Sequence, residues 1–442
     1  MSVAVTTTPP VQPAGAAPNH AAAFRLRRFA NWFPLGLTYA TLYMGRYNFN
    51  VAKGAVGAAY HFDKTQMGII ATSGFWVYAL AVLINGPLAD RLGGRRAILI
   101  GSVGSAILNV VIGLLFASHW PVGLIGGLSV LYGINMYFQS FGALSVVKVN
   151  ASWFHVRERG VLGGVFGSMI SAGYALAYGI CGWLLAAFPM FWVVYVVPSI
   201  AISIMVVVDL FFVRDKPSHA GHHDFDTGDE PMADSNDDFF AVTRHVLGHK
   251  VIRRLALAEF CTGFVRQGLL LYFPEFLDKV HHVKGGSATF SIASLGITVG
   301  GVVGALACGF VSDFFFQSRR APVAFIFYCG QIVSLLMLQS AHTPLSAALL
   351  IGFSCVWIFG VHGMLSGTAS MDFGGRRAAA TAAGLLDGIQ YLGAGLTGVG
   401  LGAILDKFSW SVWTPCLVPF SVIGAVLMLG LWNAKPNGAA AH

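Results

Sequence analysis

Two arginines, Arg46 and Arg266, stand inside long apolar stretches of the chain, where charged residues are rare. A charged side chain in a membrane-spanning helix is costly and usually marks a functional position. A guanidinium group can donate two parallel hydrogen bonds to a phosphate or a carboxylate. We therefore expect the two arginines to form an anion-binding site. The alternative is that each pairs with an acid or extends to the membrane surface. Arg46 has no acid nearby in sequence, and Glu259 lies two turns before Arg266, about 10 Å along the helix axis.

Other polar residues in the same stretches are candidates for the walls of this site. The predicted substrate-binding set is Arg46, Arg266, Tyr43, Tyr47, Gln267, Tyr272, Asp387 and Tyr391. Each neutral member is also compatible with ordinary helix packing. For Asp387 we consider three roles: binding a cationic group of the substrate, carrying a proton, or hydrogen bonding to a polar group of a neighbouring helix.

A second group of charges lies in short loops between apolar stretches. The segment GPLADRLGGRR covers residues 86–96, and a partial copy, GFVSDFFFQSRR, covers residues 309–320. These charges either anchor the loops at the membrane surface or form an ion-pair latch between helices, and the two roles are compatible. The predicted gating residues are Asp90, Arg91, Arg95, Arg96 and Asp313. Lys148 either extends to the surface or attracts substrate along its entry path.

The composition excludes a soluble protein. Of 442 residues, 56% are hydrophobic and 10% are charged, and the mean hydropathy is +0.69. Soluble domains carry about 25% charged residues. Apolar runs of about 20 residues predict membrane-spanning helices. They fall at 30–52, 67–89, 97–117, 121–148, 161–187, 190–213, 252–278, 287–313, 322–340, 344–367, 378–403 and 411–432.

The predicted fold is an all-α membrane protein with twelve transmembrane helices in two pseudo-symmetric six-helix halves. Matching features recur about 220 residues apart, including the two arginines and the two loop motifs. Such repeats place a binding site at their interface near the middle of the bilayer. The predicted organisation is a disordered tail, an N-terminal half, a polar linker, a C-terminal half and a short tail, at 1–24, 25–213, 214–251, 252–434 and 435–442.

The net charge of +8 is explained by topology, so nucleic acid is not a predicted partner. Most of the 27 Lys and Arg residues lie in alternate loops, on the side of the two termini. The opposite loops hold Lys53, Lys64, Lys279, Lys284 and Lys407. The positive-inside rule then predicts a plasma or inner membrane protein with both termini and the linker in the cytoplasm.

The loop motif GPLADRLGGRR resembles the signature loop of the major facilitator superfamily. The segments RYNFNVA (46–52), FVRQGLLLYFPEFL (264–277), YFQSFGALSVVKVNASWFHVRERG (137–160) and RRAAATAAGLLDGIQYLGAG (376–395) resemble the organophosphate:phosphate antiporters within it. The resemblance implies the major facilitator fold and two arginines that clamp the substrate phosphate, here Arg46 and Arg266. Tyr47, Val82 and Ile170 stand where relatives carry basic residues, which indicates a less basic pocket.

These observations predict a secondary active transporter of a small organic anion bearing phosphate or phosphonate. It would work by alternating access, with phosphate exchange or proton coupling. The alternatives are a carboxylate–proton symporter and a non-transporting membrane receptor for a phosphorylated metabolite. We find no catalytic triad, phosphate-binding glycine loop or ATP motif, so no enzyme activity, cofactor or metal site is expected. The predicted partners are the lipid bilayer, the anionic substrate and, depending on mechanism, inorganic phosphate or protons, and the predicted oligomeric state is a monomer.

Overall fold

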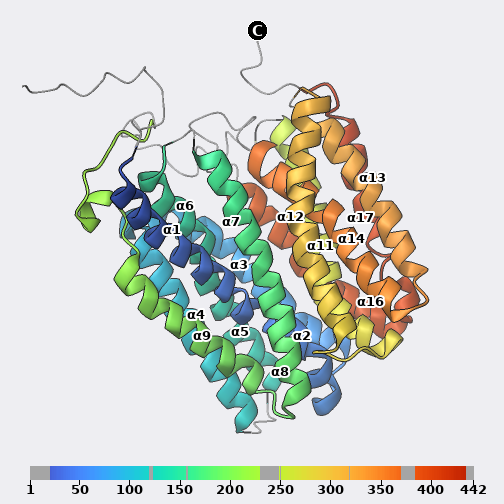
Figure 1. Ribbon diagram of the computed structural model, residues 1–442. Helices are drawn as coiled ribbons and strands as arrows, with labels where there is room; N and C mark the ends of the chain where they lie inside the picture. Colours follow the sequence, from blue (N-terminus) through green and yellow to red (C-terminus); the bar gives the residue numbers. More distant parts are fainter. Residues whose placement is uncertain are drawn as a thin grey trace, which may run out of the picture.

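The computed structural model is a bundle of long helices arranged as two groups (Figure 1). It describes residues 20–118, 123–155, 158–228, 248, 250–317, 319–369 and 384–434. Within these ranges every regular element is helical and none is a strand. The predicted all-α fold class is confirmed.

The N-terminal half is the blue-to-green group in Figure 1. Its α-helices are α1 Ala22–Leu42, α2 Met44–Tyr60, α3 Lys64–Leu92, α4 Gly94–Ala117, α5 Leu124–Gln139, α6 Phe141–Trp153, α7 Arg159–Tyr174, α8 Cys181–Ala187 and α9 Val193–Phe212. A π-helical segment, Ala175–Ile180, joins α7 to α8. Tyr43 separates α1 from α2, so the first membrane crossing is a broken helix.

The C-terminal half is the yellow-to-red group. Its α-helices are α11 Lys250–His281, α12 Ala288–Phe315, α13 Arg320–Gln339, α14 Pro344–His362, α16 Gly402–Lys407 and α17 Val418–Leu429. A π-helical segment, Gly363–Ala369, continues α14. The helical segment Gly384–Lys407 includes α16 and forms a single span.

Many described helices suit a bilayer. Nine spans are long and apolar enough to cross a membrane, judged by length and composition within the described residues. Large apolar side chains point outward along them, among them Leu80, Leu114, Phe211 and Phe314. In water this surface would be unfavourable, but lipid removes the penalty.

Local sequence signals place the helix ends. Asp63 caps α3 by accepting a hydrogen bond from the Gln66 backbone N–H, and the Gln66 side chain accepts from the Asp63 backbone N–H in return. Gly93 has a φ of 83°, which allows the sharp turn between α3 and α4. The end of the bundle at which α1 and α11 begin is called the terminal end below, and it is the upper end in Figure 1.

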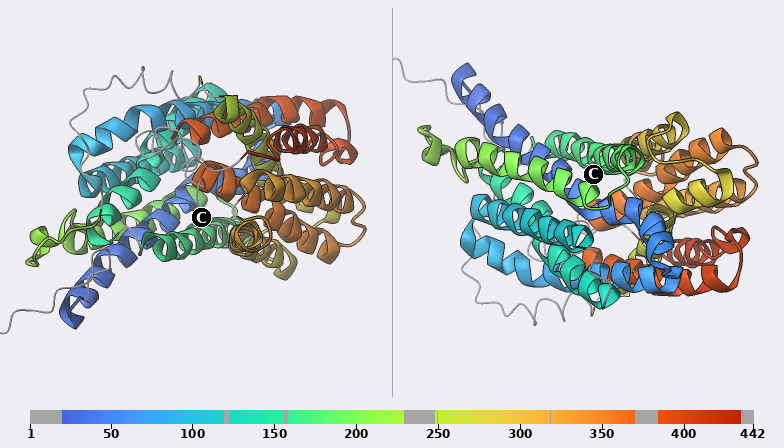
Figure 2. Two further views of the ribbon diagram at one scale, coloured as in Figure 1. Left: turned by 90° about the horizontal axis from the view of Figure 1, so that it is seen from above. Right: turned by 90° about the horizontal axis from the view of Figure 1, so that it is seen from below.

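The two halves meet along a seam, and the same division is seen from above and below (Figure 2). Glycine permits the closest approach. A Cβ on Gly68 of α3 would stand 2.1 Å from the carbonyl oxygen of Gly398 in the opposite half. Across the same seam, the Thr72 hydroxyl donates to the Gly395 carbonyl at 2.6 Å. Small residues therefore bring these backbones into contact, as is common between transmembrane helices.

The first part of the predicted linker is packed against the N-terminal half. The Trp153 indole N–H donates to the Arg214 carbonyl at 2.8 Å, and the Phe225 ring packs against Phe24. Residues 229–247 and 249 of the predicted linker lie outside the described residues, as do both predicted tails except for residues 20–24. Residues 214–228 of the predicted linker are therefore in contact with the N-terminal half through aromatic side chains.

Candidate functional site

Arg46 lies in the first turn of α2, directly after the break at Tyr43. Its side chain is 1% exposed. Nη1 donates to the Tyr391 hydroxyl at 3.2 Å, and Nη2 donates to the Gln139 carbonyl at 3.3 Å. The guanidinium lies 4.6 Å from the ring centroid of Tyr78, which contributes a cation–π contact.

Arg266 lies on α11, in the other half. It is 4% exposed, and its Nη2 donates to Gln390 Oε1 at 2.8 Å. Its guanidinium stands 5.6 Å from the ring centroid of Tyr391. The structure therefore brings both arginines, one from each half, into contact with one tyrosine, Tyr391.

Both arginines keep an unused donor. The Nε atoms of Arg46 and Arg266 are buried without a hydrogen-bond partner among the described residues. Buried N–H groups without partners are rare because the desolvation penalty is not offset. Two such donors from two halves, next to one ring, form a site that an anion can satisfy.

Three more predicted residues lie beside this site. The Tyr43 ring centroid is 5.1 Å from the Arg46 guanidinium. Gln267 donates to the Tyr47 hydroxyl at 3.4 Å across the seam, and the Tyr47 ring packs on Tyr174. The neutral wall expected from Tyr47 is thus built from tyrosines of the N-terminal half and from Gln267 of the other half.

Asp387 lies one helical turn before Tyr391 and Gln390 on the same helix, towards the terminal end. Its side chain is partly exposed, and both guanidinium groups act on its carboxylate electrostatically. Tyr78 contacts the Arg46 guanidinium, and Gln390 contacts the Arg266 guanidinium. Tyr78 was missed in the sequence because nothing in its apolar stretch distinguishes it from packing.

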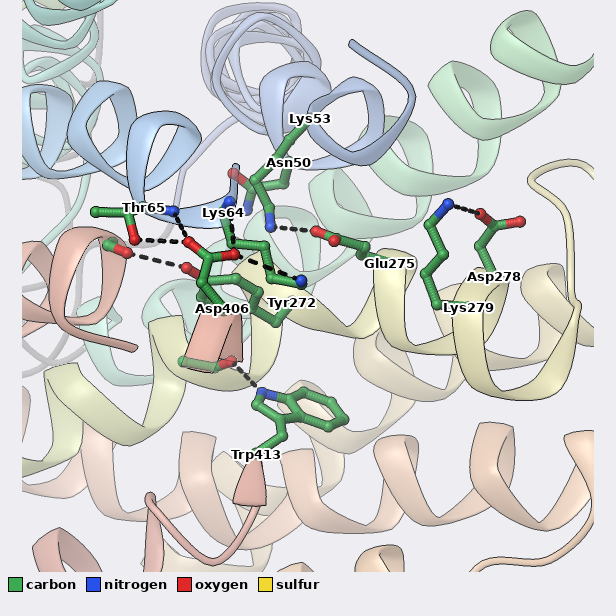
Figure 3. Close-up of polar contacts among 12 residues, drawn as sticks. Asn50, Lys53, Lys64, Thr65, Tyr272, Glu275, Asp278, Lys279, Asp406 and Trp413 are labelled. Atoms are coloured by element: carbon green, nitrogen blue, oxygen red, sulfur yellow. Dashed lines mark hydrogen bonds and ion pairs between the residues drawn. The ribbon is translucent and has the colours of Figure 1, made fainter. Parts of the chain in front are cut away.

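Tyr272 belongs to a different group at the other end of the seam. Its hydroxyl donates to the Gly398 carbonyl of a neighbouring helix in the same half at 2.9 Å, within the group of polar contacts drawn in Figure 3. Lys53 Nζ stands 3.8 Å from the centroid of the Tyr272 ring. The prediction that Tyr272 lines the arginine site is therefore not matched by its contacts.

A buried ion pair dominates this second group. Lys53 Nζ and Glu275 Oε2 are 2.7 Å apart, with side chains 1% and 9% exposed, and they come from opposite halves (Figure 3). Nearby, Asp406 accepts from the Thr65 backbone N–H at 2.8 Å and pairs with Lys64 at 3.6 Å. These residues, Lys53, Lys64, Thr65, Tyr272, Glu275 and Asp406, are called the seam cluster below.

Lys53 was predicted to be a loop cation, and the structure corrects this. It lies inside α2 and is buried, because α2 continues to Tyr60 rather than ending at residue 52. Its partner Glu275 is about 220 residues away, the offset of the internal repeat. That offset is the sequence signal that would have identified the pair.

Two of the five predicted gating residues, Asp90 and Asp313, form ion pairs within their own halves. Asp90 on α3 pairs with Lys148 on α6 at 2.6 Å, and Asp313 pairs with Arg320 at 2.8 Å. The Arg95 backbone N–H donates to Asp215 at 2.8 Å, while the Arg91 and Arg96 side chains are exposed. Lys148 thus has Asp90 as a partner, and an interhelical charge contact is present at the first loop motif.

Comparison with models of protein families identifies the superfamily to which this fold belongs. Residues 35–398 match the family model of the Major Facilitator Superfamily, which spans more than half of the chain. The chain belongs to this superfamily.

Curated relatives are similar to this chain over most of its length. The glycerol-3-phosphate transporter of Bacillus subtilis is 28% identical over 431 residues, covering 93% of this chain and 94% of the relative. A probable hexose phosphate transport protein of Chlamydia trachomatis is 26% identical, covering 95% and 93%. The membrane sensor protein UhpC of Escherichia coli is 25% identical, covering 90% and 91%. These relatives match the organophosphate:phosphate antiporter family that the motifs resemble.

A solved structure has the same fold. A bacterial homolog to the human lysosomal transporter Spinster, in an inward-facing and unoccupied conformation, has a TM-score of 0.65. It is 17% identical, and the match covers 93% of this chain and 94% of that chain. At this identity the likeness concerns the fold alone, and it agrees with the predicted major facilitator architecture.

Proposed function

We propose that this protein is a secondary active transporter of small organic anions that bear a phosphate or phosphonate group. The observation that carries the proposal is the pair of buried arginines from opposite halves, both in contact with Tyr391 and each with an Nε that has no partner in the described part of the chain. The names of the relatives, which include a glycerol-3-phosphate transporter and hexose phosphate transport proteins, support the same substrate class.

The arrangement gives a physical route to alternating access. Two guanidinium groups facing one another repel until an anion lies between them. A phosphate that accepts hydrogen bonds from Arg46 and Arg266 would neutralise the pair and draw the halves together at the site. The ligand would thereby lower the energy of the closed arrangement relative to the open ones. Exchange for inorganic phosphate follows, because an empty site resists the same movement.

Asp387, Tyr43, Tyr47, Gln267 and Tyr391 belong to the walls of the proposed site. Tyr272 acts with the seam cluster instead. Asp90 and Lys148 form the proposed latch of the first loop motif, with Arg91, Arg95 and Arg96 as its surface anchors and Asp313 as its counterpart in the other half. We place the protein in the cell membrane as a monomer, with both termini and the linker in the cytoplasm.

Two other functions remain distinct candidates. One relative is named a membrane sensor protein, which favours a receptor as the second candidate. A carboxylate–proton symporter is disfavoured by the second arginine, because one guanidinium is enough to bind one carboxylate.

Uptake into proteoliposomes tests the proposal. Vesicles loaded with inorganic phosphate should take up labelled glycerol-3-phosphate, and unlabelled methylphosphonate should compete better than lactate. Binding detected by thermal shift without uptake would identify a receptor. Uptake inhibited by lactate alone would identify a carboxylate carrier.

A further inference from the structure

A second buried contact between ionisable groups lies beside the arginine site in the C-terminal half. Glu259 of α11 is fully buried, and its Oε2 stands 3.6 Å from Nδ1 of His362 at the end of α14. The His362 side chain is 20% exposed, so water can reach the pair. The proposed clamping of phosphate does not use either residue.

Gln390 connects this pair to the anion site. Its Oε1 accepts from Arg266 Nη2 at 2.8 Å, and an arginine can only donate, so the amide orientation is determined. Its Nε2 consequently faces His362 Nδ1, at 3.2 Å. Arg266, Gln390, His362 and Glu259 form one continuous series of contacts across three helical segments.

Two neighbouring side chains, Gln390 and Glu259, compete for interaction with the Nδ1 atom of His362. Gln390 Nε2 is a donor, so it can bond to Nδ1 only when Nδ1 carries no proton. The Glu259 carboxylate is an acceptor, so it bonds to Nδ1 only when a proton lies between the two atoms, on the nitrogen or on the oxygen. At Nδ1, the hydrogen bond from Gln390 and the proton-mediated pairing with Glu259 therefore exclude one another.

We propose that Glu259 and His362 form a proton-binding site that couples proton movement to anion binding, a step that rests on the proposed transport function. A proton from water binds between Nδ1 and Oε2, and the same proton returns to water on release. When it is bound, Gln390 loses its acceptor on His362. The amide is then free to turn away from Arg266, and Nη2 becomes available to the substrate anion.

Electrostatic interactions also couple the binding of the proton to the binding of the anion. The charged groups that act on Glu259 are Arg266 on its own helix and Asp387 on the helix of Gln390. From α13, the neutral Tyr328 hydroxyl donates to the Ala258 carbonyl. From the π-helical segment that follows α14, the Ser366 hydroxyl donates to the His362 carbonyl. A bound proton adds one positive charge near Arg266 and favours the anion, and a bound anion offsets Arg266 and favours the proton. By linkage the two effects are equal, so proton binding and anion binding strengthen each other.

Paired transport assays test this coupling. In proteoliposomes, glycerol-3-phosphate uptake by the natural protein should acidify a pH dye inside the vesicles and respond to an imposed pH gradient. Glu259→Gln and His362→Asn should each reduce gradient-driven accumulation by about tenfold or more, the range typical of coupling between two sites. Both should retain measurable exchange of labelled for unlabelled glycerol-3-phosphate, because exchange moves no net proton. His342→Asn, on an exposed loop outside the site, is the matched control and should behave as the natural protein.

The outcomes separate the two proposals. Exchange without any proton movement in the natural protein would overturn the coupling and leave the transport function intact. Natural-type acidification by both variants would overturn it as well. If the natural protein neither accumulates nor exchanges any phosphate or phosphonate, the transport function itself fails.

Infrared titration tests the proton site without a substrate. The natural protein should show a protonated carboxyl band that is absent from Glu259→Gln, or an imidazolium signal that is absent from His362→Asn. Gln390→Met should keep that signal while losing gradient-driven accumulation, because it breaks the connection and not the site. If neither signal appears over the range in which carboxyl and imidazole groups titrate, the proton site is excluded.

Discussion

At the scale of single residues, the central question is how two arginines remain buried together. Among the described residues neither Arg46 nor Arg266 forms an ion pair with an acid. Each instead lies against aromatic rings, and Tyr391 offers its hydroxyl to one and its ring to the other. These contacts offset part of the desolvation penalty and leave donors for an anion.

Arg46→Lys and Arg266→Lys should each reduce exchange of glycerol-3-phosphate by about ten- to a hundredfold, since one charge-assisted hydrogen bond is worth roughly 1.5–3 kcal/mol. Lysine keeps the charge but lacks the planar fork. Initial rates of exchange measure the effect, and thermal melting checks folding. Arg254→Lys, on the same helix as Arg266 and exposed, is the control. Near-normal rates for both variants would remove the clamp from the mechanism.

Asp387→Asn should strengthen binding of glycerol-3-phosphate by about three- to tenfold, because it removes a negative charge close to two guanidinium groups. The same change should weaken binding of 2-aminoethylphosphonate if the carboxylate receives the ammonium group. Isothermal calorimetry on both ligands measures the two affinities. Equal affinities before and after the substitution would assign Asp387 to helix packing alone.

Near Arg46, the sequence predicted a site residue that shares a helix face with the arginine. Tyr43 and Arg46 are three residues apart, so they lie on one face of adjoining turns. Tyr272 is six residues beyond Arg266, which turns it to another face and moves it about 9 Å along the axis. Lys53 was missed for a different reason. A prediction from hydropathy ends a helix at a charged residue, even where a partner from the other half of the protein neutralises that charge.

At the scale of elements, the seam cluster holds α2 against α11. Lys53→Met leaves the Glu275 carboxylate buried and unpaired, a change that costs about 3–5 kcal/mol in buried pairs. The seam should therefore open at this end, which exposes Val51 beside it. With the six natural cysteines replaced by alanine, maleimide labelling of Val51→Cys should accelerate about tenfold or more, as expected for a shift of more than 1.4 kcal/mol.

The exchanged pair, Lys53→Glu with Glu275→Lys, is the control for this experiment, because it restores the attraction with the same atoms nearby. It should return the labelling rate towards that of the natural pair. If Lys53→Met labels Val51→Cys no faster than the natural pair does, the seam cluster is a packing contact and not a gate.

At the scale of the whole molecule, the halves and their order along the chain were predictable because hydropathy and the internal repeat are long-range patterns. The contacts between the halves were not. Gly68 and Gly398 meet because neither has a side chain, and glycine is too frequent in this chain, at 54 residues, for one pair to stand out. The seam thus depends on three-dimensional register, which no single stretch of sequence contains.

Orientation in the membrane is the last prediction, and it rests on the uneven distribution of Lys and Arg between loops. Ser218 is exposed at the terminal end, and Lys284 is 79% exposed at the opposite end. In the cysteine-free protein, a membrane-impermeant maleimide added to intact cells should label Lys284→Cys and leave Ser218→Cys unmodified until the cells are opened. Both sites are surface-exposed in the fold, so a difference in labelling reports the side of the membrane and not burial. Labelling of Ser218→Cys in intact cells would reverse the orientation, and the Asp90–Lys148 contact would then face the outside, where it would control release from the other side of the cycle.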